Sequence, residues 1–125
     1  MSNHGVFVGA RILIPSVFVG LGLERLLVGA GILAGGPVSA GALAFSAFEL
    51  IAGLLVMLGW KVRWVASLLA LFIVVDAFLA HAFWTYPIAE RHGQLLHFLK
   101  NLSTLGGLVL LAWLDDSPAY QTAQH

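Results

Sequence analysis

The 125-residue chain contains no cysteine and few charged residues. Without cysteine it cannot form a disulfide of its own, and thiolate catalysis and cysteine-ligated metal or iron–sulfur clusters are excluded. Charged residues make up 10% of the chain, against about 25% in ordinary soluble domains, so it cannot cover itself with polar surface. Six basic and six acidic residues give zero net charge, which provides no basic field for nucleic acid.

Recognisable catalytic motifs are also lacking. The sequence has no nucleophile elbow, phosphate-binding loop or metalloprotease helix. We therefore do not expect catalysis by this chain alone, and any redox role would need a bound cofactor or a partner. No basic segment precedes the first apolar run, which we interpret as a retained membrane span and not as a signal peptide.

Long apolar runs are what the chain does contain, since 60% of its residues are hydrophobic. Four runs are each about twenty residues long, which as a helix crosses a hydrocarbon core of about 30 Å. They are Val6–Val28, Ala40–Gly59, Val62–Trp84 and Leu95–Leu114, followed by a polar tail over 115–125. The sequence therefore predicts an all-α, integral membrane bundle of four transmembrane helices that forms a single domain over residues 1–125.

Basic residues near the ends of the runs predict the orientation. With an inside N-terminus, Arg11, Lys61 and Arg63 lie on the inner face, and Arg25 and Arg91 lie on the outer face. An excess of Lys and Arg marks the cytoplasmic side of a membrane protein. We therefore expect a multi-pass protein with both termini in the cytoplasm.

Some runs carry side chains that are costly in lipid. Such groups usually face the bundle interior and find a partner there, so they are the candidate functional residues. They are Glu24, Arg25, Glu49, Asp76, His81, His97, Lys100 and Asn101. On the fourth run, His97, Lys100 and Asn101 share one helical face. We expect a polar pocket in the outer half of the bundle.

Lys100 is expected to meet an acid. Counting along antiparallel spans puts Asp76 at a similar depth, with Glu49 and Glu24 as the second and third candidates. Such a pair could be purely structural and set which helix faces which. Three acids for one deep lysine exceed that need, so an unmatched carboxyl would hold a proton or bind a ligand. On this second interpretation the ligand-binding residues are Glu49, Asp76, His81, His97, Lys100 and Asn101.

Two histidines near the outer ends of the third and fourth runs raise the question of a haem or metal site. His81 and His97 could reach the same level, which is one way to hold a haem iron. Asp76 and His81, however, are about 140° apart on a continuous helix, and no third metal ligand is evident. We expect no metal and rank haem below quinone. Trp84 and Tyr86 are predicted as interfacial anchors, with stacking on a flat ring such as a quinone as the alternative.

Four stretches carry a family resemblance. They are ARILIPSVFVGLGLERL, FELIAGLLVMLGW, LFIVVDAFLAHAFW and HFLKNLSTLGGLVLLAW, and their most specific parts are Glu49, His81–Trp84 and Phe98–Leu102. Together they resemble the DoxX family of small bacterial four-helix membrane proteins, over about residues 9–114. The resemblance implies a bacterial inner membrane and an association with quinone-linked or oxidative-stress redox systems.

The resemblance leads to an expected function. It is that of a small integral subunit of a membrane redox assembly, in contact with lipid and a protein partner, whose outer pocket binds quinone or another small lipophilic molecule. In this hypothesis Glu49 holds a proton, while His81, His97 and Asn101 donate hydrogen bonds to a ligand carbonyl. Transport of a small solute or proton and a scaffold role without a ligand are the alternatives. The ligand, the partner and any homo-oligomer stay open.

Overall fold

The computed structural model describes residues 2–115 of the chain, and every regular element in this range is helical. The elements are α1 (Asn3–Leu13), α2 (Ser16–Gly29), α3 (Ala40–Leu58), α4 (Val62–Leu79), the short 3₁₀ helix η1 (Phe83–Thr85) and α5 (Ile88–Asp115). Four helical segments are long and apolar enough to cross a membrane, namely Asn3–Gly29, Ala40–Leu58, Val62–Thr85 and Ile88–Leu114. The predicted all-α membrane bundle of four spans is confirmed, while the polar tail from residue 116 onward lies outside the described residues.

The first span consists of two helices rather than the single helix expected over Val6–Val28. Pro15 has no backbone N–H, and its ring clashes with the carbonyl four residues earlier, so a regular helix is interrupted there. The N–H groups of Phe18 and Val19 donate to the Pro15 carbonyl at 3.0 and 3.2 Å, which starts α2. The apolar run crosses this break without any change in hydrophobicity.

The fourth helix begins at Ile88 and not at Leu95 as expected. The Pro87 carbonyl accepts hydrogen bonds from the N–H groups of Glu90 and Arg91, both at 3.0 Å. An acidic residue in the first turn also favours a helix start, because it lies near the positive end of the helix dipole. Hydrophobicity predicted the lipid-embedded part of α5 and missed the polar turns that precede it.

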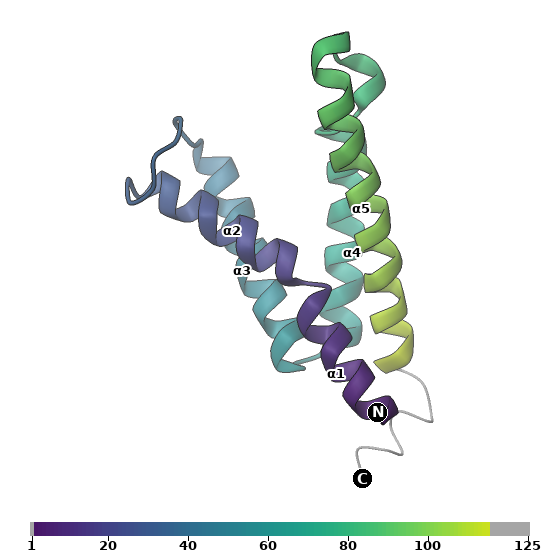
Figure 1. Cartoon of the computed structure of the whole chain (residues 1–125). Coiled ribbons are helices and arrows are strands. Elements are labelled where there is room, and N and C mark those ends of the chain that lie inside the picture. The colour runs from purple at the N-terminus through teal and green to yellow at the C-terminus, as the bar shows by residue number, and fades with distance from the viewer. Residues whose placement is uncertain (1, 116–125) are drawn as a thin grey trace.

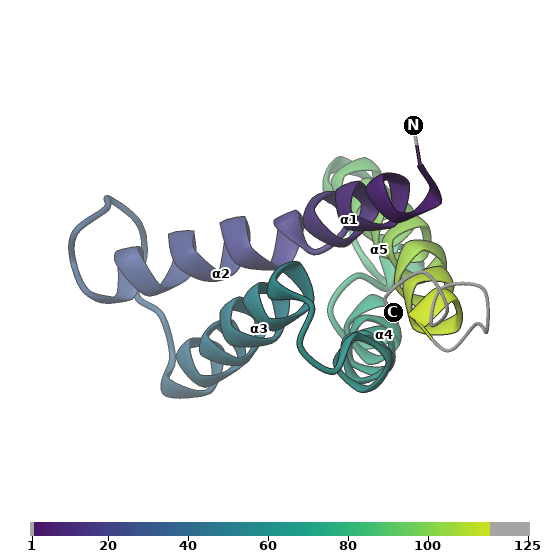
Figure 2. The ribbon, with the colours of Figure 1, turned by 90° about the horizontal axis from the view of Figure 1, so that it is seen from below.

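The helices form two hairpins that diverge like the arms of a V (Figures 1 and 2). One hairpin is α2 packed along α3, the other is α4 packed along α5, and α1 contacts both α3 and α5. We call the end with α1 and the α3–α4 turn the closed end. We call the opposite end, with η1 and residues 30–39, the open end, because the arms are separated there (Figure 1).

The hydrophobic core lies toward the closed end. The largest apolar side chains that are almost completely buried come from α3, α4 and α5, and they are Val56, Val62, Leu69, Leu108 and Leu111. Phe7 of α1 belongs to the same cluster. Because burial of apolar groups is concentrated here, the closed end holds the two hairpins together.

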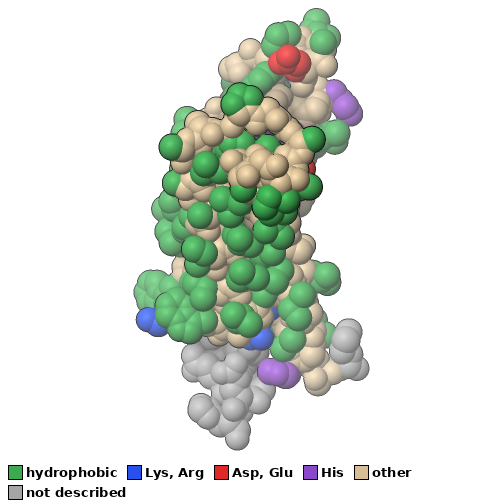
Figure 3. All heavy atoms as spheres, turned by 90° about the vertical axis from the view of Figure 1, so that its left-hand side faces the viewer, with side chains coloured by type: hydrophobic (Ala, Val, Ile, Leu, Met, Phe, Trp, Pro, Cys, Tyr) green, Lys and Arg blue, Asp and Glu red, His purple; other side chains and the backbone are tan. Residues whose placement is uncertain are grey.

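The outer surface is apolar, as expected for contact with lipid. Leu13, Leu58 and Leu79 are 72%, 78% and 79% exposed. In Figure 3 hydrophobic side chains cover the middle of the visible face, while its Lys and Arg side chains lie toward the lower end and its His side chains toward both ends. Such a band matches the hydrocarbon core of a bilayer and identifies a membrane-type four-helix protein.

Close packing of α2 against α3 depends on glycine. A Cβ at Gly22 would lie 2.8 Å from the backbone oxygen of Ser46 and 3.2 Å from the backbone nitrogen of Leu50. Backbone atoms cannot move aside as the end of a flexible side chain can. Gly20, on the same helix, has open space around its Cβ position. Small residues of this kind allow membrane helices to approach each other closely.

We therefore expect Gly22→Ala to lower the free energy of unfolding by about 1–3 kcal/mol, the usual cost of overpacking. Gly20→Ala is the matched control and should leave stability unchanged or raise it slightly, since alanine favours helix. Thermal unfolding of both variants in detergent, followed by circular dichroism, measures the difference. Equal melting temperatures for the two variants would contradict the proposed contact.

Candidate ligand-binding site

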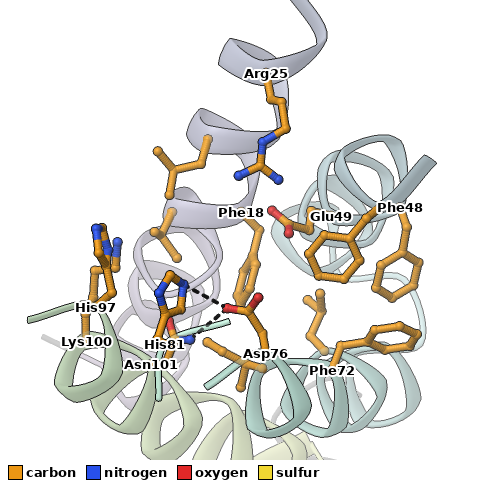
Figure 4. A pocket seen from close by; sticks show the side chains of 15 residues that line it. Phe18, Arg25, Phe48, Glu49, Phe72, Asp76, His81, His97, Lys100 and Asn101 are labelled. Carbon is orange, nitrogen blue, oxygen red and sulfur yellow. Dashed lines mark hydrogen bonds and ion pairs between the residues drawn. The ribbon is translucent and has the colours of Figure 1, made fainter. Parts of the chain in front are cut away.

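A cavity of about 290 Å³ lies between the two hairpins, and we call it the hairpin cavity. Side chains from α2, α3, α4 and α5 line it, together with His81, which follows α4. The residues predicted to bind a ligand all lie on its wall, namely Glu49, Asp76, His81, His97, Lys100 and Asn101 (Figure 4). The structure shows that these six residues line one cavity. Their role in binding a ligand stays a prediction.

Asp76 is the polar centre of the cavity wall. Its Oδ2 accepts a hydrogen bond from Asn101 Nδ2 at 3.0 Å and lies 3.3 Å from His81 Nε2 (Figure 4). Asn101 is only 8% exposed, and this partly buried hydrogen bond joins α4 to α5. The contact places Asp76 beside Asn101, the neighbour of Lys100, for which the sequence analysis expected a similar depth.

The sequence analysis expected Asp76 and His81 to point in directions about 140° apart, and this expectation was wrong. It assumed a continuous helix, but α4 ends at Leu79, and His81 lies in the turn before η1. The Tyr86 hydroxyl donates to the Ala80 carbonyl at 2.9 Å and helps to hold this turn. Because the chain leaves the helix, the imidazole can turn back toward the carboxylate one and a half turns earlier.

His81 has two further neighbours. Its Nδ1 lies 2.8 Å from Gln94 Oε1 of α5. Its ring stacks on that of His97, with centroids 4.9 Å apart and planes inclined by 28°. Directly stacked rings do not face each other across a space that a haem iron could occupy. Sequence reasoning missed Gln94, because it assigned this residue to a loop and α5 starts earlier.

Lys100 does not form the predicted ion pair with Asp76, and this expectation was wrong. Among the residues whose side chains are described, no carboxylate lies within 4.0 Å of the Lys100 ammonium. Successive helical residues are about 100° apart. Since Asn101 faces Asp76, Lys100 is turned toward the flank of the cavity wall, where its side chain is exposed.

Arg25 and Glu49 face each other on the other side of the cavity (Figure 4). Arg25 Nη1 donates to the hydroxyl of Ser46 at 3.4 Å, and Ser46 is fully buried. The guanidinium and the Glu49 carboxylate are not within ion-pair distance of 4.0 Å. Arg25 therefore lines the hairpin cavity, and it also borders the α2–α3 loop at residues 36–38.

Aromatic rings form the apolar wall. The Phe48 and Phe72 rings lie 4.5 Å apart, and the Phe45 ring is 6.0 Å from that of Phe72. Phe18 of α2 extends this wall. Trp84 and Tyr86 are not among the residues that line the cavity, and Trp84 packs against the ring of Phe98 at 5.8 Å. We call Phe18, Phe45, Phe48 and Phe72 the phenyl wall.

Residues 39–116 match the sequence profile of the SURF4 family. This stretch is more than half of the chain and contains all six predicted ligand-binding residues. The chain belongs to the SURF4 family. No curated protein and no solved structure gives a match.

The resemblance to the DoxX family was wrong, because the family match is to SURF4. The motifs that suggested DoxX are short and are set in apolar sequence, where chance similarity is high. The redox and oxidative-stress associations that it implied therefore lose their basis. The placement of polar residues in the spans does not depend on that resemblance, since it follows from the cost of burying them in lipid.

Chemically, the cavity of this SURF4-family protein combines an apolar half with a polar half. Phenyl rings can cover the body of a small ligand, while ammonium, guanidinium, imidazole and amide groups can donate hydrogen bonds to its head. Within residues 2–115, no group of three or more His, Asp or Glu side chains has the arrangement of a metal site. Noncovalent binding is the chemistry that this arrangement fits best.

The contact between Asn101 and Asp76 should stabilise the α4–α5 hairpin. We expect Asn101→Ala to lower the free energy of unfolding by about 1–2 kcal/mol, because a partly buried carboxylate loses a hydrogen-bond donor. Ser103→Ala is the control, since the exposed Ser103 hydroxyl bonds only the Leu99 carbonyl of its own helix. Chemical denaturation in mixed micelles would compare the two, and an equal loss in both would refute the role of Asn101.

Proposed function

We propose that this SURF4-family protein binds a small amphipathic molecule in the hairpin cavity. The proposal is carried by one observation. A single cavity of about 290 Å³ is lined both by the phenyl wall and by polar side chains, which come from four helices and from the α4–η1 turn. Ligand pockets in proteins begin at about 300 Å³ and are mostly apolar with a few convergent polar groups. The hairpin cavity lies at the lower end of that range, so it suits one ring system or the head region of a larger lipid.

The roles of the polar residues follow from their partners. The hydrogen bond from Asn101 orders Asp76, so these residues shape the wall and position His81. Glu49, which has no ion-pair partner among the described side chains, is the carboxyl that would hold a proton or accept a hydrogen bond from the ligand. His97 and Lys100 can reach a ligand head, because each lines the cavity with an exposed side chain.

A quinone is one candidate ligand. Its flat ring suits the phenyl wall, because stacked or edge-on aromatic contacts are favourable, and its carbonyl oxygens could accept hydrogen bonds from the polar half. A place as a subunit of a redox assembly with a protein partner would use the same cavity. Transport of the bound molecule and a scaffold role without a ligand are the alternatives that the next experiment separates.

Blocking the cavity should release its ligand. We expect Leu21→Trp, at a residue that lines the cavity, to reduce at least tenfold the small molecules that copurify in mild detergent. Leu23→Trp is the matched control, because Leu21 and Leu23 are 43% and 45% exposed on the same helix and only Leu21 lines the cavity. Mass spectrometry of extracts from both variants and from the wild type, with quinones included among the standards, gives the measurement. Equal retention by the two variants would overturn the proposal.

Orientation and location are part of the proposal. We infer that the closed end faces the cytoplasm of a bacterial inner membrane, with both termini on that side. Arg11, Lys61 and Arg63 support this, because they belong to the closed end, and the positive-inside rule assigns such an end to the cytoplasm.

Because the chain has no cysteine, a single introduced cysteine can report on which side of the membrane its position lies. We expect Gly36→Cys, in the α2–α3 loop, to react with a membrane-impermeant maleimide in intact cells. Ser2→Cys should react only after the membrane is permeabilised. Labelling of the two variants, scored by gel shift with the unlabelled wild type as control, decides the point. The opposite pattern would reverse the proposed orientation.

A further inference from the structure

Asp76 already has polar partners of its own. Its Oδ2 accepts a hydrogen bond from Asn101 Nδ2 at 3.0 Å and lies 3.3 Å from His81 Nε2. Gln94 Oε1 of α5 lies 2.8 Å from His81 Nδ1, so the imidazole is held against the carboxyl group from its other side. The Asp76 carboxyl group is therefore engaged within the cavity wall and is not the partner of Lys100.

The second carboxyl group of the cavity wall does not meet Lys100 either, because Glu49 faces Arg25 (Figure 4). Lys100 then stands alone, since no described carboxylate lies within 4.0 Å of its ammonium group. Lys100 is on the same wall as Asp76 and His81, on the turn of α5 that carries Asn101.

An unpaired ammonium group within a membrane-spanning helix is costly and normally has a counter-charge. We propose that the ligand of the hairpin cavity has an oxyanion head, which pairs with Lys100, and an apolar body, which contacts the phenyl wall. This inference rests on the proposed function and narrows its ligand to one chemical class. The oxyanion can be the carboxylate of a free amphipathic acid or the phosphodiester of a membrane lipid. A neutral quinone would leave Lys100 without its counter-charge.

The first test compares two probes of nearly the same shape on the intact chain. The purified protein, in nanodiscs of phosphatidylcholine, is titrated with 2-naphthoate and with 2-naphthamide, which differ in the charge of the head. We expect naphthoate to bind about tenfold more tightly or better, the usual gain from a charge-assisted hydrogen bond. Equal affinities for both probes would overturn the anionic head.

Variants then assign the preference to Lys100. Lys100→Gln should abolish the advantage of naphthoate over naphthamide, and Lys100→Arg should retain most of it, because arginine keeps the charge. Lys61→Gln is the matched control at the closed end, outside the hairpin cavity, and should behave as wild type. An unchanged preference in Lys100→Gln would overturn the role of this residue. If that variant does not fold, the comparison of probes on the wild type still decides the charge of the head.

The source of the oxyanion is resolved by lipid composition. Phosphatidylglycerol included in the nanodisc should displace naphthoate if the natural head is a lipid phosphodiester. Naphthoate binding that is insensitive to phosphatidylglycerol assigns the site to a free carboxylate, and both results support the oxyanion. If neither probe binds, the anionic head is overturned. The proposed function itself fails only if Leu21→Trp and Leu23→Trp also retain the same copurified molecules, so the two failures are distinguishable.

Discussion

A carboxylate inside a membrane-spanning helix has to be hydrogen-bonded or neutralised, and the way in which Asp76 meets this constraint organises one half of the molecule. Asn101 reaches Asp76 from α5, and His81 reaches it from the turn that follows α4. These contacts fix the register of α4 against α5. The other hairpin depends on a different principle, since α2 and α3 approach closely because Gly22 lacks a side chain. The two hairpins are thus internally well defined, and the space between them is the cavity.

Much of the fold follows from the sequence because lipid is a simple solvent. Apolar runs of sufficient length must become helices, since no water is available to hydrogen-bond an open backbone. The same cost explains why Glu49, Asp76 and Lys100 could be selected as wall residues of one interior space without any structural knowledge. The break at Pro15 and the early start of α5 were missed, because hydrophobicity reports contact with lipid and not helix boundaries.

Pairwise contacts within the site were less predictable. Depth along a helix does not distinguish Lys100 from Asn101, although they differ by about 100° in direction, and only one of them meets Asp76. The direction of the His81 side chain does not follow helical geometry, because α4 ends two residues before it. Family assignment from short motifs failed for a related reason, since a few polar residues in apolar sequence carry little information. The match to the SURF4 family over residues 39–116 uses the whole pattern of three spans.

The position of Asp76 has a consequence for biogenesis. Its partners Asn101 and His81 both follow it in the chain, and so does Gln94, which holds His81. During synthesis α4 therefore emerges with its carboxyl group unsatisfied, and α5 supplies the missing donors only later. A helix whose carboxyl group obtains its hydrogen-bond donors from the next helix is best inserted together with that helix. The α4–α5 hairpin is therefore expected to insert into the bilayer as one unit, after α1, α2 and α3 have been inserted.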